Sequence, residues 1–373
     1  MADATDGMNP RATERADTRA AEGADTRPAE GADTRAAEGA DNLLALIAAC
    51  RGKRVVVFGD LIADEFVYGR IARVSREAPV LILEYDATEI VPGGAGNAAN
   101  NVASLGGIVR LVSLVGRDEP GRRLFTVLPR AVERAGLTRP GGYRTPVKTR
   151  ILAGGIHSAK QQVVRIDRYT SEVVSDSHRA AAERAAMRAI KDADAVLISD
   201  YGSGLVQPRF VSELAGRLRS RKTPVPILID SRYALTRYRG LTACTPNESE
   251  VEQVLGVRID DNKKVLERAG RALLKRTRMA SVLITRGSRG MALFEAGKPT
   301  VHIPIFGSDQ IADVTGAGDT VMATMTLALA AGGSFEQAAR LANFAGGLVV
   351  MKRGTATVSA AELRRAVGSG GRD

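Results

Sequence analysis

Short runs of aliphatic residues alternate with longer amphipathic segments along most of the chain. The runs that suit buried strands are residues 54–58, 108–115, 195–199, 226–230 and 282–285. Helical spacing of apolar residues marks residues 121–135, 177–192, 261–277 and 334–351. Strands that are apolar along their whole length must be covered on both sides. The alternation therefore predicts an α/β fold with a mostly parallel central sheet and helices on both faces.

Two regions depart from this alternation. Residues 66–90 and 143–169 contain extended segments with little helical periodicity, most clearly at 80–83 and 162–167. They predict a small β lid beside the α/β body, of the kind that excludes water from a reacting phosphate. The alternative is an additional hairpin at the edge of the main sheet.

The first 41 residues differ in composition from the rest. Residues 16–39 repeat an eight-residue unit as ADTRAAEG, ADTRPAEG and ADTRAAEG, without a large apolar side chain. Such a segment cannot bury enough surface to offset the entropy of ordering it, so residues 1–41 are predicted to form a disordered tail, with transient helix formation as the alternative. Asn42 is predicted to cap a first helix, and residues 42–373 are predicted to form one domain.

Composition indicates the cellular compartment and the binding partners expected for the protein. Cys50 and Cys244 are far apart and no cysteine–histidine cluster occurs, which favours a reduced, cytoplasmic setting. No apolar run reaches the roughly 18 residues of a membrane span, so no membrane partner is predicted. The net charge of +11 suits anionic ligands such as nucleotides and sugar phosphates, and the alternative is a solvated basic surface. Nucleic acid is not a predicted partner, because no zinc spacing or aromatic-interleaved basic patch accompanies the charge.

The candidate chemistry centres on residues 313–319, DVTGAGD. Gly316, Ala317 and Gly318 permit a tight turn whose N–H groups converge at the start of a helix, where anions bind. A phosphoryl group in transfer is such an anion, and Asp319 beside it is placed to take a proton from an attacking hydroxyl. The alternative is a simple helix entry with an aspartate near the cap.

A second glycine-rich segment, PGGAGN at residues 92–97, opens another helical stretch. Gly93 and Gly94 let the backbone approach a small ligand, and Asn97 offers both a donor and an acceptor to sugar hydroxyls. The alternative is a glycine-rich loop in which Asn97 caps the helix.

Two later segments suit nucleotide binding. Asn247 and Glu250 share a face on a first helical turn, and their oxygens suit Mg²⁺ near phosphates, although the same spacing is also that of a capping box. The loop TRGSRG at residues 285–290 follows an apolar strand, at the end where α/β sheets bind ligands. It lacks the lysine of a Walker A loop, so it is not one.

In this order, the four segments resemble those of the ribokinase-like (PfkB) carbohydrate kinases. The resemblance covers about residues 53–366, with GGAGNAA at 93–99 similar to the N-terminal signature and DVTGAGD at 313–319 similar to the C-terminal one. It implies a phosphotransferase that uses ATP and Mg²⁺, with Asp319 as the catalytic base and residues 316–318 as an anion hole.

The resemblance also implies binding residues. Those that match the ATP site are Asn247 and Glu250, which handle Mg²⁺ mostly through water, and Thr285, Gly287, Gly290 and Asn343. Those that match the acceptor site are Asp64, Gly93, Gly94, Asn97, Arg150, Gln161, Arg165 and Asp319. Some members of the family bind a monovalent cation near the positions of Asp313 and Thr315, and many dimerise through their β lids. A K⁺ site and a homodimer are therefore expected.

Within the family, the chain most resembles the D-glycero-β-D-manno-heptose 7-phosphate kinases, which serve ADP-heptose biosynthesis for lipopolysaccharide precursors. The segments RVSREAPV at 73–80, SDY at 199–201 and KRGTATVS at 352–359 carry this resemblance. The implied reaction phosphorylates the anomeric hydroxyl of the heptose. The alternatives are another sugar kinase of the family, acting on ribose, fructose or a fructose phosphate, and a non-catalytic sugar or nucleotide sensor.

The chain departs from that group at two lysines. Ser203 stands where the group usually has a lysine, and Arg232 ends a segment, DSR, where the group has Asp-Pro-Lys. The loss of a lysine near the acceptor weakens the case for a phosphorylated sugar. Arg232, Arg150 and Lys160 are the candidates to supply the missing charge.

Overall fold

A computed structural model of the chain describes residues 29–154, 160–168, 174–307 and 313–370. The described residues from Ala40 onward form one compact unit. The first helix, α1, spans Ala29–Ala49, so it begins within the repeat segment and not at Asn42 as predicted. The repeat is rich in alanine, which has the highest helix propensity. The rest of the predicted tail lies outside the described residues, as do residues 155–159 and 169 of the predicted lid range.

A nine-stranded sheet forms the centre of the body, in the order β13-β12-β11-β10-β9-β8-β1-β4-β5. Its parallel strands are β1 (Arg54–Gly59), β4 (Ile108–Leu114), β5 (Val132–Thr138), β8 (Ala195–Asp200), β9 (Ile227–Ser231), β10 (Ala243–Cys244) and β11 (Ser281–Thr285). Two antiparallel strands, β12 (Met291–Glu295) and β13 (Val301–Ile303), complete one edge. The predicted mostly parallel sheet is confirmed.

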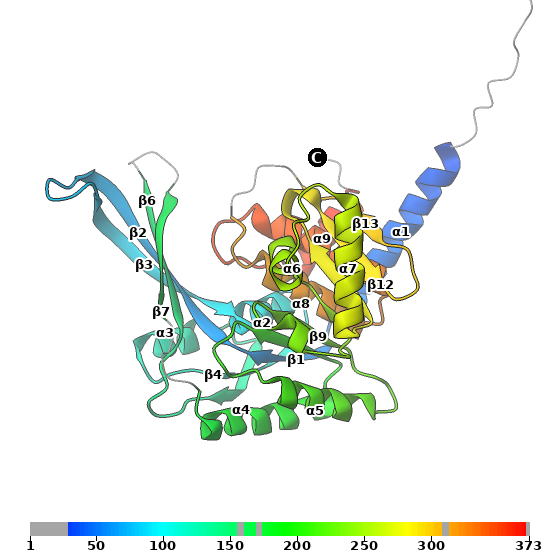
Figure 1. The fold of residues 1–373 in the computed structure, drawn as a ribbon, viewed down its shortest axis with the longest axis horizontal. Coiled ribbons are helices and arrows are strands. Elements are labelled where there is room, and N and C mark those ends of the chain that lie inside the picture. Colours follow the sequence, from blue (N-terminus) through cyan, green and yellow to red (C-terminus); the bar gives the residue numbers. More distant parts are fainter. Residues whose placement is uncertain (1–28, 155–159, 169–173, 308–312, 371–373) are drawn as a thin grey trace, which may run out of the picture. The chain divides into compact units, whose positions relative to one another are not determined.

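Helices cover both faces of this sheet (Figure 1). The helices are α2 (Ala95–Ser104), α3 (Glu119–Val127), α4 (Asp176–Ala189), α5 (Pro208–Arg219), α6 (Glu248–Leu255), α7 (Lys263–Thr277), α8 (Ala317–Ala330), α9 (Phe335–Val350) and α10 (Ala360–Gly368). In β1, Val55 and Val57 pack with residues of α2, α8 and α9, whereas Val56 and Phe58 pack with residues of α4, α5 and α7. All four side chains are fully buried, as a strand covered on both sides requires. None of the described helices is long and apolar enough to cross a membrane.

A separate four-stranded sheet, in the order β3-β2-β6-β7, forms the lid (Figure 1). Its strands are β2 (Leu61–Val74), β3 (Leu81–Gly94), β6 (Val147–Gly154) and β7 (Gln161–Arg168). β2 begins with buried residues and ends with exposed ones, and β3 runs the opposite way. The lid is therefore anchored at the ends of β2 and β3 that adjoin β1 and α2. The alternative of an additional hairpin on the main sheet is wrong.

The helix predicted over residues 121–135 is wrong in its second half. α3 ends at Val127, and β5 begins at Val132. Pro129 follows, and a proline disfavours helical backbone in the residue before it. Leu128 accordingly has φ −56° and ψ 129°. Val132 then pairs with Val109 of β4, so strand pairing at the sheet edge overrides the helical spacing of the sequence.

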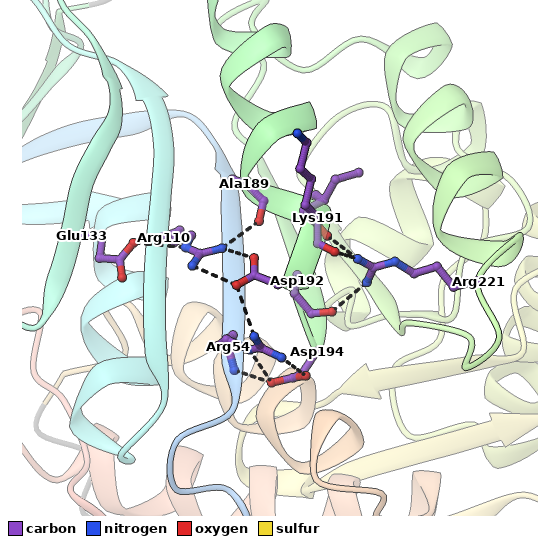
Figure 2. Close-up of polar contacts among 10 residues, drawn as sticks. Arg54, Arg110, Glu133, Ala189, Lys191, Asp192, Asp194 and Arg221 are labelled. Carbon is purple, nitrogen blue, oxygen red and sulfur yellow. Dashed lines mark hydrogen bonds and ion pairs between the residues drawn. The ribbon is translucent and has the colours of Figure 1, made fainter.

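An ion-pair network connects the strands at the edge of the sheet where the parallel strands begin (Figure 2). The backbone N–H of Arg54 donates to Asp194 at 2.8 Å, and its guanidinium contacts Asp192 at 3.2 Å. Arg110 of β4 contacts the same Asp192 and also Glu133 of β5, both at 3.1 Å. These groups are partly exposed, so the network is expected to add little to stability. It lies at the edge of the sheet opposite to the carboxyl ends of β1 and β8, which are followed by Asp60 and Tyr201.

Candidate active site

The glycine-rich segment before α8 follows a backbone conformation that glycine favours. Gly316, the N-cap of α8, has φ 78° and ψ 3°. A Cβ atom at Gly316 would lie 2.5 Å from Nδ2 of Asn97. The helix begins at Ala317, so Asp319 lies in its first turn. The Asp319 carboxylate is thus beside the positive end of the helix dipole.

Asp319 is a buried carboxylate with two fixed hydrogen-bond donors. Its side chain accepts from Nδ2 of Asn97 at 2.8 Å and from the hydroxyl of Tyr201 at 3.1 Å. Burial raises the pKa of Asp319 from 3.8 to about 6, although these two hydrogen bonds and the charge of Lys148 oppose the rise. Above that pH, Asp319 is a carboxylate that can accept a proton.

The orientation of Asn97 is set by polar contacts between α2 and α8. Nδ2 of Asn101 donates to Oδ1 of Asn97 at 3.1 Å, and the hydroxyl of Thr320 donates to Asn101 at 3.2 Å. Nδ2 of Asn97 also donates to the carbonyl of Gly316 at 3.2 Å. The N-cap of α2 is Gly94, so the alternative that Asn97 caps this helix is wrong. The side chain instead joins the two glycine-rich segments.

Tyr201 and Lys148 adjoin Asp319, although the sequence patterns gave neither of them a role. Tyr201 comes directly after β8, and its ring lies 3.4 Å from the position of a Cβ at Gly94. Nζ of Lys148 lies 4.3 Å from the centre of the Tyr201 ring, a cation–π distance. Burial lowers the pKa of Lys148, whereas the carboxylates of Asp64 and Asp319 favour its charged form.

A second buried carboxylate, Asp60, holds the loop that carries Tyr201. It accepts from the backbone N–H groups of Tyr201 at 2.8 Å and Ser203 at 3.2 Å, and from the Ser203 hydroxyl. Burial raises the pKa of Asp60 to about 6 despite these bonds. Ser231 makes a similar internal contact, because its hydroxyl donates to Asp200 at 2.8 Å. Both serines that depart from the heptose kinase pattern therefore bind neighbouring aspartates.

Asp64 and Arg150 form a buried ion pair where the lid joins the body. Their side chains are 8% and 11% exposed, and Nη1 of Arg150 lies 2.6 Å from Oδ1 of Asp64. A Cβ atom at Gly93 would lie 2.1 Å from Oδ2 of Asp64, so this close approach requires glycine. The structure therefore brings these three predicted acceptor-site residues together.

Gln161 and Arg165, which were also predicted for the acceptor site, lie on the exposed strand β7. Arg165 is opposite Arg150 in the strand register, and its guanidinium contacts Asp167 at 2.8 Å. Gln161 pairs with Ala153, farther from the base of the lid. The register thus places Arg165 across from the buried ion pair and Gln161 nearer the far end of the lid.

Asn247 and Glu250 form a capping box at the start of α6. Oδ1 of Asn247 accepts from the Glu250 N–H at 2.8 Å, and Oε2 of Glu250 accepts from the Asn247 N–H at 2.9 Å. The structural alternative for this pair is therefore confirmed, and the box fixes both side chains on one turn. Asn247 also forms a parallel bridge with Thr285 at the end of β11, which brings three predicted nucleotide-site residues together.

The turn after β11 contains the two glycines predicted to contact the nucleotide. Gly287 and Gly290 have φ values of 57° and 74°. A Cβ atom at Gly290 would lie 2.1 Å from the carbonyl oxygen of Ile303. Asn343 of α9 donates to the carbonyl of Pro304 at 2.9 Å. The turn and Asn343 therefore contact the same short segment, residues 303–304.

Asp230, at the end of β9, lies within electrostatic reach of Asp319 and of Glu250 in the predicted nucleotide site. Burial raises its pKa well above the usual value, and the charges of Glu250 and Asp319 raise it further. Burial also raises the pKa of Glu250. Among the described residues, no group of three or more acidic, histidine or cysteine side chains could hold a metal ion, so a divalent cation at Asp230 and Glu250 would need water for most of its ligands. The sequence patterns did not assign Asp230 a role.

Asp313 connects the glycine-rich segment to the chain that follows α9. Its carboxylate accepts from the N–H groups of Thr315 at 2.8 Å and Gly354 at 3.1 Å. Its own N–H donates to the carbonyl of Val350 at 3.1 Å. Asp313 and Thr315 are the residues near which a monovalent cation was expected.

Sequence comparison identifies the class of the protein. The model of the pfkB family of carbohydrate kinases matches residues 53–362, which is most of the chain. The chain therefore belongs to the pfkB family of carbohydrate kinases. It is a phosphotransferase with an alcohol group as acceptor, as its sequence predicted.

Several curated relatives carry the name Bifunctional protein HldE. Bifunctional protein HldE of Geobacter metallireducens is 39% identical over 328 residues, which are 88% of this chain and 65% of that protein. Bifunctional protein HldE of Coxiella burnetii, strain RSA 331, is 38% identical over 315 residues, which are 84% of this chain and 63% of that protein. The chain thus spans a little under two thirds of the length of these relatives.

Solved structures confirm the ribokinase-like fold. Arabidopsis thaliana ribokinase, solved with ribose and ATP, has a TM-score of 0.62 at 20% identity and covers 86% of this chain and 98% of its own. Escherichia coli phosphofructokinase-2, solved with fructose-6-phosphate, has a TM-score of 0.67 at 17% identity and covers 86% of this chain and 100% of its own.

Proposed function

We propose that the chain transfers the γ-phosphoryl group of ATP to D-glycero-β-D-manno-heptose 7-phosphate and forms the 1,7-bisphosphate. The observation that carries the phosphoryl transfer is the buried Asp319 carboxylate, which Asn97 and Tyr201 hold at the start of α8. The choice of acceptor rests on the resemblance to heptose 7-phosphate kinases and on the similarity to the HldE proteins.

In this proposal, Asp319 takes the proton of the acceptor hydroxyl as its oxygen attacks the γ-phosphorus. Two donors fix the carboxylate, and its remaining lone pairs are left for the acceptor. Asp64, Asn97 and the backbone of Gly93 and Gly94 bind sugar hydroxyls. Arg150, Gln161 and Arg165 complete the acceptor site from the lid.

The transferred phosphoryl group is stabilised by the amides of Gly316, Ala317 and Gly318 at the start of α8. The Ala317 N–H donates to the carbonyl of Val314 at 3.2 Å, so this bond must open when that amide binds the phosphoryl group. The rest of ATP is bound by Thr285, Gly287, Gly290 and Asn343. Asn247, Glu250 and Asp230 would hold Mg²⁺, mostly through water, and the ion would neutralise phosphate charge.

A coupled assay of ADP release over a panel of sugars tests this proposal. The highest kcat/KM is expected with heptose 7-phosphate, and lower values are expected with ribose, fructose and fructose 6-phosphate. Faster turnover of another sugar would change the acceptor but keep the kinase. If ATP bound but no sugar released ADP, a sugar or nucleotide sensor would be the better conclusion.

The kcat/KM for the acceptor is expected to rise with pH through about 6 and then level off. Asp319 must be ionised to act as a base, and its pKa is about 6. Tyr201→Phe removes one of the hydrogen bonds that lower this pKa, so the midpoint of the profile should move to higher pH. The measurement is kcat/KM from about pH 5 to pH 8 for the wild type and the variant.

Tyr238→Phe is the matched control for this profile. The Tyr238 hydroxyl is also buried and donates to a carboxylate, that of Asp200, at 2.7 Å. This variant should keep the wild-type midpoint. If Tyr201→Phe kept it as well, the hydrogen bond to Asp319 would not set the pKa of the base.

We also propose that the chain forms a homodimer through its lid. Many of the exposed large apolar side chains lie on the lid strands, at Ile71, Val74, Leu81, Tyr85, Val163, Val164 and Ile166. A concentration of exposed apolar side chains marks an interaction surface. Sedimentation should show a dimer for the wild type and a monomer for Val164→Glu/Ile166→Glu. A wild-type monomer would refute the proposal.

A K⁺ site near Asp313 and Thr315 is the last part of the proposed function. Asp313 ties its own segment to Gly354, so a cation bound there would act on the start of α8 through these contacts. Replacing K⁺ with Na⁺ in the assay is expected to lower kcat. Equal rates in both salts would remove this site.

A further inference from the structure

A buried ammonium group next to the base has no ion-pair partner in the part of the chain that the structure describes. Lys148 is 7% exposed, and its contact is with the Tyr201 ring. The carboxylates that favour its charge are those of Asp64, Asp167 and Asp319, and Asp167 already contacts Arg165 at 2.8 Å. Asp64 is already paired with Arg150 at 2.6 Å, and Asp319 already accepts two hydrogen bonds.

Arg232 places a second positive charge near Lys148. It follows β9, and its N–H donates to the carbonyl of Asp200 at 3.1 Å, next to the loop that carries Tyr201. Its charge is close enough to lower the pKa of Lys148. Within the described residues, its exposed guanidinium has neither a hydrogen bond nor an ion pair.

We propose that Lys148 and Arg232 bind the phosphate group of the acceptor, and that they make this kinase specific for sugar phosphates. The inference rests on the proposed function and names its specificity residues. The free energy needed to remove an ammonium from water exceeds the stabilisation from one cation–π contact. An anionic ligand is therefore needed to complete the site. Charge-assisted hydrogen bonds from two cations suit a phosphate.

The other charges near the acceptor are already paired. Arg150 is neutralised by Asp64, and Lys160 contacts Asp86. Ser203, at the position of a lysine in the heptose kinases, donates to Asp60. Arg232 is therefore the one of the three sequence candidates that remains available to bind a phosphate. Lys148, which the sequence analysis did not propose, is the second.

The test compares kcat/KM for a heptose 7-phosphate with that for the same heptose without phosphate. The wild type should prefer the phosphorylated sugar. Lys148→Met should lower kcat/KM for that sugar about 100-fold, mainly through KM, and Arg232→Met about 10-fold. At about pH 8, where Asp319 stays ionised, both variants should leave kcat/KM for the unphosphorylated sugar within about threefold of the wild type. Lys160→Met, which removes a paired lysine from the lid, is the matched control and should change neither value.

Three outcomes would overturn the inference: no preference in the wild type, equal losses on both acceptors, or no loss in Lys148→Met. Equal losses would mean that Lys148 acts on the transferred phosphoryl group. A binding measurement separates this inference from the proposed function, because the sugar phosphate should raise the melting temperature of the wild type more than that of Lys148→Met even without turnover. The melting temperature of each free variant shows whether it is folded.

Discussion

Asp319→Asn is expected to lower kcat about 1,000-fold, while ATP binds with wild-type affinity. The amide cannot take a proton from the acceptor, but it has the shape of the carboxylate. Its oxygen can accept from Asn97, and its nitrogen can donate to the hydroxyl of Tyr201. The two contacts that hold residue 319 are therefore kept, and the loss reports the missing base. The measurements are steady-state kcat and the dissociation constant of ATP.

The same substitution should stabilise the fold at neutral pH. The folded-state pKa of Asp319, about 6, lies above the ordinary value of 3.8. The stability that this raised pKa provides is fully present below pH 3.8 and is lost as pH rises through 6. The difference amounts to roughly 3 kcal/mol. The variant should therefore melt above the wild type near pH 8, and this gain should disappear near pH 4.

Asp192→Asn is a suitable control for these experiments. Asp192 belongs to the network at the opposite edge of the sheet (Figure 2), and its pKa is lowered by its hydrogen bond with Arg110. The Asp192→Asn variant should retain wild-type kcat and should not melt above the wild type at high pH. If Asp319→Asn instead retained the full rate, the assignment of the base would be wrong.

The sequence predicted the central sheet because buried parallel strands are continuous apolar runs. The strands at 54–58 and 195–199 fall within β1 and β8 as observed. β5 escaped prediction because its residues, VERAGLT, lie at the sheet edge and lack a continuous apolar run. An edge strand is packed against fewer neighbouring elements than a central strand. Its sequence therefore contains fewer apolar residues in a row.

The candidate site was predicted where its residues follow one another along the chain. Gly316 and Asp319 share one turn, and Asn247 and Glu250 share another, so their spacing carries the signal. Tyr201, Lys148 and Asp230 are single residues on three different strands or strand ends. Their proximity to Asp319 comes from the strand order and from the junction of the lid with the body. No local pattern encodes that proximity, although the end of a buried strand is a place to look for such residues.

Gly316→Ala is expected to impair both stability and catalysis. At φ 78°, backbone strain at an alanine is expected to lower the free energy of unfolding by about 1–2 kcal/mol. Its Cβ would also lie 2.5 Å from Nδ2 of Asn97, whose side chain is held by Asn101 and Asp319 and cannot turn away freely. Asn97 must shift, and the base shifts with it. A displacement of this kind is expected to lower kcat about 100-fold.

Gly332→Ala separates the two effects. Gly332 also has a positive φ, 88°, but a Cβ atom there would meet nothing within 4 Å, and the residue follows the other end of α8. It should show a comparable fall in melting temperature with an unchanged kcat. Gly316→Ala should lower kcat as well, because only its added Cβ crowds Asn97, whereas that of Gly332→Ala does not. Wild-type kcat in Gly316→Ala would show that the contact between Asn97 and Asp319 does not position the base.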